Sequence, residues 1–153
     1  MEPFTFRLAA LIFALTVTAA LTGAAIYEQS VLDPVWPRNP SLVRPREGGV
    51  HRKPFWVPAN IAGILSLVFA VWAGWPVPSV RNATLLAAGL FLVIIVATAI
   101  YFVPGVLRVE NTPVPPNDPA SLAWVRHTHW RLPFALGANI SLAVAIVRAI
   151  ATR

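Results

Sequence analysis

The residues best suited to acid–base chemistry in this sequence stand just outside its apolar segments. His127, His129 and Arg131 come shortly before the last apolar run, and Glu28 directly follows the first one. A histidine can take up a proton near neutral pH, and a nearby cation or carboxylate can stabilise the charge that results. These four side chains are therefore the predicted catalytic residues of a proton-transfer site. For Glu28 the alternative role is structural, as an ion-pair partner of Arg52 or Arg131.

The spacing of the two histidines limits what they can do together. On a helix, His127 and His129 point about 200° apart, so they cannot both face one ligand. His127 instead shares a helix face with Trp124 and Arg131, which stand three residues before it and four residues after it. This triple is the preferred catalytic cluster. For each histidine taken alone, a hydrogen-bonding role at the membrane interface is the structural alternative.

Metal and haem sites are less favoured alternatives. A metal held by His127 and His129 would need an extended backbone there and further ligands, such as His51 and Glu28. The sequence has no cysteine, so thiolate ligands are excluded. A bis-histidine haem site is less favoured still, because no histidine lies inside an apolar run. No metal and no organic cofactor is therefore predicted.

Four apolar runs must position these residues. Of the 153 residues, 57% are hydrophobic and only 12% are charged, about half the charged share of ordinary soluble domains. The runs approach or exceed the about 18–20 residues that cross a bilayer core of about 30 Å. We predict an all-α, polytopic membrane four-helix bundle with a single transmembrane domain over residues 1–153. The helices are expected at about 4–27, 58–75, 80–103 and 133–150, with a short helix at about 119–131 before the last.

Prolines set several of the predicted helix limits. Asp118-Pro119 pairs an N-cap acceptor with a proline at the first helical position, which is typical of a helix start. Pro104-Gly105 is expected to end the third long helix, and Pro133 to kink the fourth or separate it from the short helix. Proline also recurs in the two long connections.

An internal repeat indicates that the chain is a tandem duplication of a two-helix hairpin. When the sequence is shifted by 79 positions, residues 52–61 match residues 131–140 at six of ten positions. A weaker echo precedes each copy, since Ala25-Ile26-Tyr27 and Ala99-Ile100-Tyr101 each end a long apolar run. A pseudo-twofold axis along the membrane normal would then relate the two halves.

Asn60 and Asn139 are equivalent in this repeat and are predicted to face each other near the long-loop end of the bundle. A buried amide must find a hydrogen-bond partner, so each could also fix its own helix to a neighbour. If they line the floor of a polar pocket, the polar and aromatic residues around them would bind the substrate. The predicted substrate-binding residues are Asn60, Asn139, Tyr27, Tyr101, Arg52, Trp56, Trp124 and Trp130.

Charge indicates the surroundings of the protein. The net charge of +6 is spread over the loops and both ends, which fits anionic lipid headgroups better than nucleic acid. The face with the two long loops carries eight Lys or Arg residues, and the other face carries four. Because positive loops tend to stay on the cytoplasmic side, this count favours cytoplasmic long loops. The expected location is the cell (inner) membrane. Helices rich in Ala and Gly also permit a homo-oligomer.

Short motifs over nearly the whole chain resemble the anthrone oxygenase-like membrane proteins, a family of small four-helix proteins that is largely a domain of unknown function. The similar stretches are Tyr27-Glu28 followed by Asp33-Pro34-Val-Trp36, Tyr101-Phe-Val-Pro104, and a Trp124…Trp130-Arg131 segment entering the last helix. In that family an asparagine often stands shortly before the arginine, where this sequence has Thr128.

The resemblance implies oxidation of a polycyclic anthrone to an anthraquinone by O₂ as co-substrate, without metal or flavin. His127 or His129 would then be the base, Arg131 and Asn139 would stabilise the enolate oxygen, and Glu28 would orient the histidine or the arginine. We therefore expect an oxidoreductase, a membrane-embedded oxygenase acting on a hydrophobic, aromatic or polycyclic small molecule. The alternatives are a non-catalytic small-molecule or lipid-binding accessory protein and, less favoured, a metal-binding membrane protein.

Overall fold

In the computed structural model, which describes residues 3–152, the chain folds into helices and forms no strand within that range. The long helices are α1 (Pro3–Tyr27), α2 (Lys53–Gly74), α3 (Pro78–Ala97) and α6 (Arg131–Ala151). Two shorter helices, α4 (Val103–Asn111) and α5 (Pro119–Thr128), extend the bundle at one end. The connection between α1 and α2 contains the short 3₁₀ helices Pro40–Val43 and Pro45–Glu47.

Four helical stretches are long and apolar enough to cross a membrane. They are Phe4–Leu32, Lys53–Gly74, Pro78–Asn111 and Pro119–Ala151. Most of their side chains are not covered by protein, as expected for helices whose outer faces meet lipid. These four helices indicate an integral membrane protein, in agreement with the composition.

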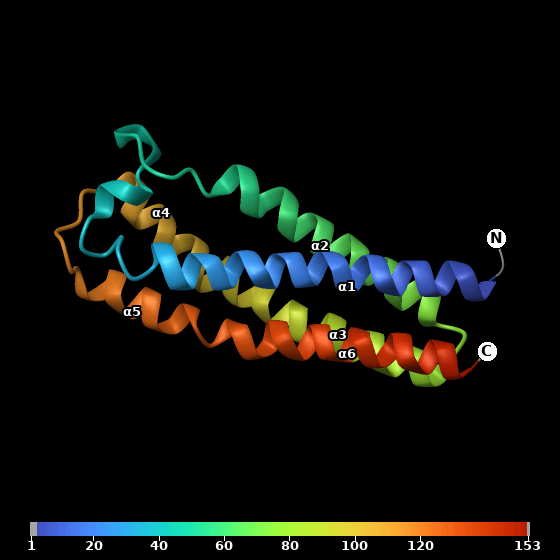
Figure 1. Ribbon diagram of the computed structural model, residues 1–153. Coiled ribbons are helices and arrows are strands. Elements are labelled where there is room, and N and C mark those ends of the chain that lie inside the picture. Colours follow the sequence, from blue (N-terminus) through green and yellow to red (C-terminus); the bar gives the residue numbers. More distant parts are fainter. Residues whose placement is uncertain (1–2, 153) are drawn as a thin grey trace.

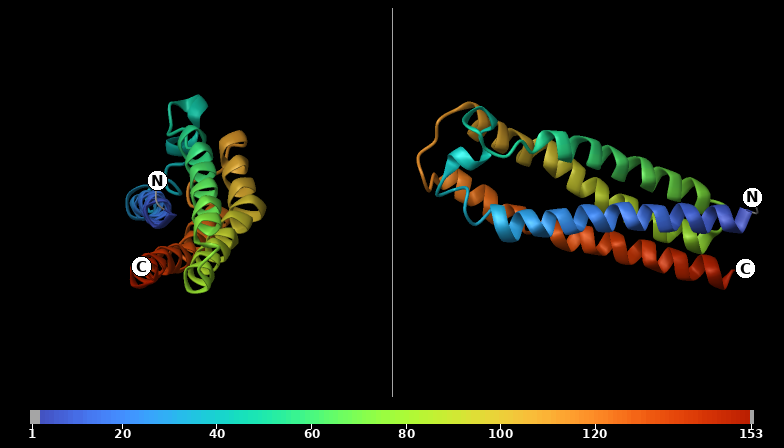
Figure 2. Two further views of the ribbon diagram at one scale, coloured as in Figure 1. Left: turned by 90° about the vertical axis from the view of Figure 1, so that its right-hand side faces the viewer. Right: turned by 45° about the horizontal axis from the view of Figure 1, so that its top comes forward.

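The helices lie lengthwise beside one another, with the longer connections gathered at one end (Figures 1 and 2). Both chain ends and the short turn between α2 and α3 lie at the opposite end (Figure 1). We call these the loop end and the terminal end. Helix α3 packs most extensively on α6, and α1 packs on both α2 and α6. The arrangement brings the starts of α2 and α6 to the loop end, close to the segment that follows α1.

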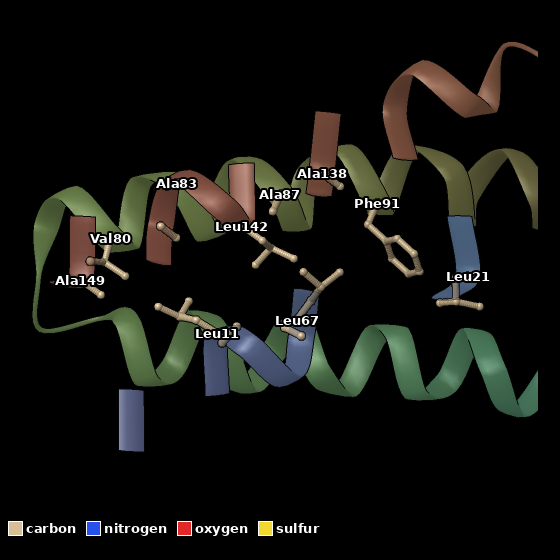
Figure 3. Packing of buried hydrophobic residues seen from close by; sticks show 13 residues of the cluster. Leu11, Leu21, Leu67, Val80, Ala83, Ala87, Phe91, Ala138, Leu142 and Ala149 are labelled. Carbon is tan, nitrogen blue, oxygen red and sulfur yellow. The ribbon is translucent and has the colours of Figure 1, made fainter. Parts of the chain in front are cut away.

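Small residues fill the centre of the bundle. Ala87 on α3 and Ala145 on α6 are completely buried and belong to one apolar cluster with Leu142 and Leu11. Figure 3 shows Ala87, Leu142 and Leu11 in this cluster. Lipid tails are as apolar as leucine, so burial of apolar surface contributes little free energy to helix association in a membrane. Close backbone approach over small side chains supplies the packing energy instead.

Three of the predicted helix limits are wrong: the start of the second long helix, the end of the third and the end of the short helix. The helix expected from residue 58 begins at Lys53, with Pro54 in its first turn and Pro58 accommodated inside it. The third long helix does not stop at Pro104-Gly105 but passes through a π-helical turn, Thr98–Phe102, into α4. Because the π turn ends at Phe102, Pro104 falls in the first turn of α4, where its missing N–H removes no hydrogen bond.

The other proline signals have the effects expected of them. Asp118 caps α5, since its side chain accepts a hydrogen bond of 2.9 Å from the N–H of Ser121, and Pro119 takes the first helical position. Pro133 lies in the first turn of α6. The short helix ends at Thr128, three residues earlier than predicted, because the chain turns at His129 and Trp130 before α6 starts.

The close contact of α3 with α6 can be tested by overpacking it. Ala87→Leu adds bulk at a fully buried site and should lower the unfolding free energy by about 1–3 kcal/mol. Leu86→Ala, on the lipid-facing side of the same turn, is the control and should change stability little. Thermal unfolding in detergent measures both. Equal effects of the two substitutions would contradict the packing described.

Candidate functional site

Four charged side chains meet at the loop end and form what we call the ion cluster: Glu28, Asp33, Arg52 and Arg131. Arg52 lies 3.5 Å from Glu28 (Nε to Oε1) and 3.5 Å from Asp33 (Nη2 to Oδ1). Arg131 adds a second positive charge that acts on both carboxylates. Two carboxylates therefore balance two guanidiniums, which makes burial of the group tolerable. The structural alternative for Glu28, an ion pair with Arg52, is present.

Aromatic rings enclose the ion cluster. Arg52 is 7% exposed and its Cζ lies 5.9 Å from the centre of the Trp36 ring and 5.6 Å from that of Trp124. Asp33 is 1% exposed and accepts a 3.1 Å hydrogen bond from Trp36 Nε1. Trp124 Nε1 donates to the carbonyl of Phe102 at 3.1 Å. The two indoles thus exclude water from Arg52 while each keeps its own hydrogen bond.

The contacts of Arg52 with the carboxylates are electrostatic rather than ideal hydrogen bonds. Its Nε and Nη2 atoms are buried without a partner that meets hydrogen-bond geometry. A guanidinium held in this way depends on the nearby negative charges and the ring faces for its stabilisation. Removal of either carboxylate would leave Arg52 poorly compensated.

Arg131 is fixed by the break between α5 and α6. It donates to the hydroxyl and, at 3.5 Å, to the carbonyl of Thr128, and its Cζ lies 4.1 Å from the centre of the Phe102 ring. Gln29 Nε2 donates to the same Thr128 carbonyl at 3.2 Å. Because the π-helical turn Glu28–Leu32 carries both Gln29 and Glu28, the end of α1 is tied to the starts of α2 and α6.

Burial raises the pKa of Asp33. The positive charge of Arg52 acts in the opposite direction, the nearby negative charge of Glu28 adds to the increase, and the Trp36 hydrogen bond and Arg131 oppose it. Desolvation therefore outweighs the neighbouring cations at this carboxyl group.

His127 forms the most suggestive pair outside the ion cluster. Its Nδ1 shares a hydrogen bond of 2.8 Å with the hydroxyl of Tyr101, and the two rings lie 5.6 Å apart. Tyr101 belongs to the π-helical turn before α4, so the pair joins that turn to α5. His127 is exposed, as is His129, but no such partner is found for His129 among the interactions of residues 3–152. The structure thus distinguishes between the two histidines.

A small cavity of about 120 Å³ is lined in part by Tyr101, the partner of His127. Tyr101, Trp36 and Trp124 contribute to its wall, together with Gly105. Gly105 lets the Trp124 ring approach the α4 backbone closely, since a Cβ there would stand 2.5 Å from Trp124 Cδ1. The remaining lining residues of the cavity are Arg108, Val109, Ala120 and Ser121. Arg108 is held by Asp118, with Nη2 2.7 Å from Oδ2, so a positive charge is fixed at the rim.

The two asparagines have separate partners. Asn60 donates to the carbonyl of Trp56 on its own helix at 2.8 Å, and Asn139 donates to the hydroxyl of Thr22 on α1 at 2.9 Å. Neither lines the cavity. Asn139 therefore has the alternative role of tying α6 to α1, and the pair does not form the shared pocket floor that the repeat led us to expect.

The other predicted residues are dispersed. Of the predicted substrate-binding group, Tyr101 and Trp124 line the cavity and Arg52 lies in the ion cluster. Tyr27 is 65% exposed, while Trp130 packs at 5.3 Å on Phe134 and away from the cavity lining. Of the predicted catalytic group, Glu28 and Arg131 meet in the ion cluster. His127 is instead hydrogen-bonded to Tyr101, which lines the cavity.

Sequence reasoning missed several residues that build the site. Asp33 is as central as Glu28, and Gln29 and Thr128 link the helix ends. Asp33 stands in the motif Asp33-Pro34-Val-Trp36, where an acid three residues before a tryptophan is well placed for the observed side-chain contact. No comparable signal marks Gln29 or Thr128.

Within residues 3–152, no group of three or more His, Asp or Glu side chains is arranged to hold a metal ion. Comparison of the chain with models of protein families, with curated proteins and with solved structures gives no match.

The burial of Asp33 predicts that the stability of the folded protein depends on pH. Its pKa is higher in the folded than in the unfolded state, so the folded state binds more protons between the two values and stability falls as pH rises through that window. Asp33→Asn lacks this titration while retaining an acceptor for Trp36. The stability of the wild type relative to Asp33→Asn should therefore increase as the pH is lowered from 7 toward 4, about 3.9 being the unfolded value. Thermal unfolding at several pH values measures the difference, and a constant difference would contradict the prediction.

Proposed function

We propose that the protein is a small membrane-embedded enzyme that acts on a hydrophobic, aromatic or polycyclic molecule. The observation that carries the proposal is the Tyr101–His127 hydrogen bond beside an aromatic-lined cavity. A base at the edge of an apolar cavity can remove a proton from a hydrophobic substrate that reaches it from the bilayer. The motifs shared with anthrone oxygenase-like proteins favour the same class of substrate.

The hydrogen bond can select the catalytic form of His127. If Nδ1–H donates to the Tyr101 oxygen, Nε2 carries the free lone pair and is the base. Tyr101 then orients the ring and stabilises the imidazolium that forms. His127 is exposed and bonded to Tyr101, which lines the cavity, so we place its Nε2 within reach of a substrate at the cavity mouth. The fixed guanidinium of Arg108 supplies positive charge for a developing oxyanion at the rim.

The proposed reaction is a cofactor-independent oxygenation resembling anthrone oxidation. His127 removes a proton from the methylene group that lies between the two aryl rings, opposite the ketone and conjugated with it through those rings. The resulting enolate donates electrons to O₂. A C–O bond forms, a peroxide results, and loss of one water leaves the quinone. Substrate and O₂ thus give quinone and water, with O₂ as the oxidant. A cavity that holds one benzene ring measures about 150 Å³, so a polycyclic substrate inserts one ring edge and rests its remainder on the apolar surface.

The repeat in the sequence supports a proposal about the origin of the fold. Arg52 and Arg131 occupy equivalent positions before α2 and in the first residue of α6, and both belong to the ion cluster. We propose that two copies of a helical hairpin supply one arginine each to the ion cluster.

The charge distribution supports a proposal about orientation. The excess of Lys and Arg in the long connections favours a cytoplasmic loop end in the cell membrane. The Ala-rich helices are also compatible with a homo-oligomer.

A non-catalytic accessory protein is the second candidate. It is favoured by the ion cluster, in which Arg52 is buried and engaged by two carboxylates and two rings. In this second candidate, the polar residues only stabilise the loop end. The cavity then binds a lipid tail or a small molecule without a reaction.

Substitution of the dyad separates the two candidates. His127→Gln should reduce O₂ consumption with an anthrone by about 10²–10⁴-fold, since general base catalysis typically contributes that much. Tyr101→Phe retains the ring but not the hydroxyl and should reduce kcat less. An oxygen electrode and the quinone absorbance measure the rate.

His51→Gln is the matched control, because His51 is also exposed at the loop end but is not the histidine bonded to Tyr101. His129→Gln tests the other histidine that the sequence offered. If the wild type consumes no O₂ above a buffer blank, or if His127→Gln has the wild-type rate, the enzymatic proposal fails and the accessory role is favoured.

A further inference from the structure

An apolar groove runs along the outside of the bundle between α1 and α2. Phe13 on α1 and Leu65, Phe69 and Trp72 on α2 form its wall, with Ala62, Ser66 and Val68 completing it. The groove has a volume of about 610 Å³, about five times that of the cavity at the loop end. Ser66 presents no free polar group there, because its hydroxyl donates to the carbonyl of Gly63.

The position of the groove matches the depth of one lipid leaflet. Its α2 lining extends from Ala62 to Trp72, which at 1.5 Å per residue covers about 15 Å. That is half of a bilayer core of about 30 Å. Trp72 and Trp75 mark the end of α2, where tryptophan side chains meet the headgroup region. The groove therefore runs from this interface to the middle of the membrane.

The terminal end carries positive charge without acidic compensation in the described part of the chain. Arg7, Arg81 and Arg148 lie there. The acidic residues of that part all belong to the loop end: Glu28, Asp33, Glu47, Glu110 and Asp118. An anionic headgroup at the terminal end thus meets cations and no opposing carboxylate among residues 3–152.

Arg7 is held at the end of α2 that carries Trp72, although it is not itself one of the residues that line the groove. Its Nε donates to the carbonyl of Ala73 at 3.2 Å, which fixes the guanidinium at the end of α2 beside Trp72. Phe6, the preceding residue, packs edge-on against Phe69 at 5.2 Å and Trp72 at 5.5 Å. A fixed guanidinium therefore stands at the same end of α2 as the interfacial end of the groove.

We propose that this groove binds an anionic phospholipid, with the phosphate at Arg7 and one acyl chain along Phe13, Leu65 and Phe69. The headgroup phosphate accepts hydrogen bonds from guanidinium nitrogens that the Ala73 carbonyl does not use. The acyl chain fills the groove to the middle of the membrane and covers the contact between α1 and α2. The site lies at the opposite end of the bundle from the ion cluster and does not depend on the proposed reaction.

Native mass spectrometry of the detergent-purified protein tests the site, with phosphatidylglycerol and phosphatidylcholine as probes. The wild type should retain phosphatidylglycerol in preference to phosphatidylcholine. Arg7→Gln should reduce this retention about fivefold, since one interfacial cation contributes about that factor. Arg148→Gln is the matched control, because Arg148 also donates to a backbone carbonyl, that of Ser79 at 3.0 Å, at the same end but away from the groove.

A second variant tests the acyl chain independently of Arg7. Ala62→Phe narrows the groove from its inner end and should also reduce phosphatidylglycerol retention, whereas Leu86→Phe on the lipid-facing side of α3 should not. The proposal is overturned if Arg7→Gln and Arg148→Gln have equal effects, if Ala62→Phe retains the lipid fully, or if glycerol phosphate alone displaces it. Thermal unfolding of each variant without lipid establishes that it is folded.

Discussion

The loop end of the bundle depends on one buried guanidinium. Arg52 stands immediately before α2, and the two carboxylates that engage it come from the segment directly after α1. A cation in this position is stable only while both neighbours remain in place, because burial of an unpaired charge costs several kcal/mol. The contact thus fixes where the long connection leaves α1 and where it re-enters the membrane.

Other features of the loop end follow from this constraint. The indoles of Trp36 and Trp124 cover Arg52, and Trp124 also lines the cavity. Movement of Arg52 would therefore move Trp124, and with it the helix face that carries His127. The ion cluster and the proposed catalytic pair are different groups of residues, but the same tryptophan contacts both regions. A substitution in the cluster can consequently alter the cavity without touching its lining.

The sequence predicts the bundle because length and apolarity are properties of whole segments. Four apolar runs need no knowledge of their neighbours to be recognised as helices of a membrane protein, and a local cap such as Asp118 before Pro119 marks a helix start by itself. Pro104 misled the prediction because proline ends a helix only when its N–H would have been bonded. The π-helical turn just before it removes that conflict, and no feature of the sequence announces a π turn.

The site is less predictable, because it is built from pairs that are distant in the chain. Glu28 and Arg131 were identified by their place at helix ends, whereas Asp33 gained its role only when Arg52 was brought beside it. The choice of His127 over His129 required Tyr101, which stands 26 residues away. Asn60 and Asn139 were predicted to share one role because they are equivalent in the repeat. In the folded protein they have different hydrogen-bond partners, the carbonyl of Trp56 and the hydroxyl of Thr22.

The interaction energy between Asp33 and Arg52 tests this account most directly. Unfolding free energies of the wild type, Asp33→Asn, Arg52→Met and the double variant form a thermodynamic cycle. For two charges in buried contact the account predicts a coupling of about 1–3 kcal/mol, with the double variant more stable than the sum of the single effects implies. Single effects that add within about 0.5 kcal/mol would show that Arg52 does not hold the loop end through this carboxylate.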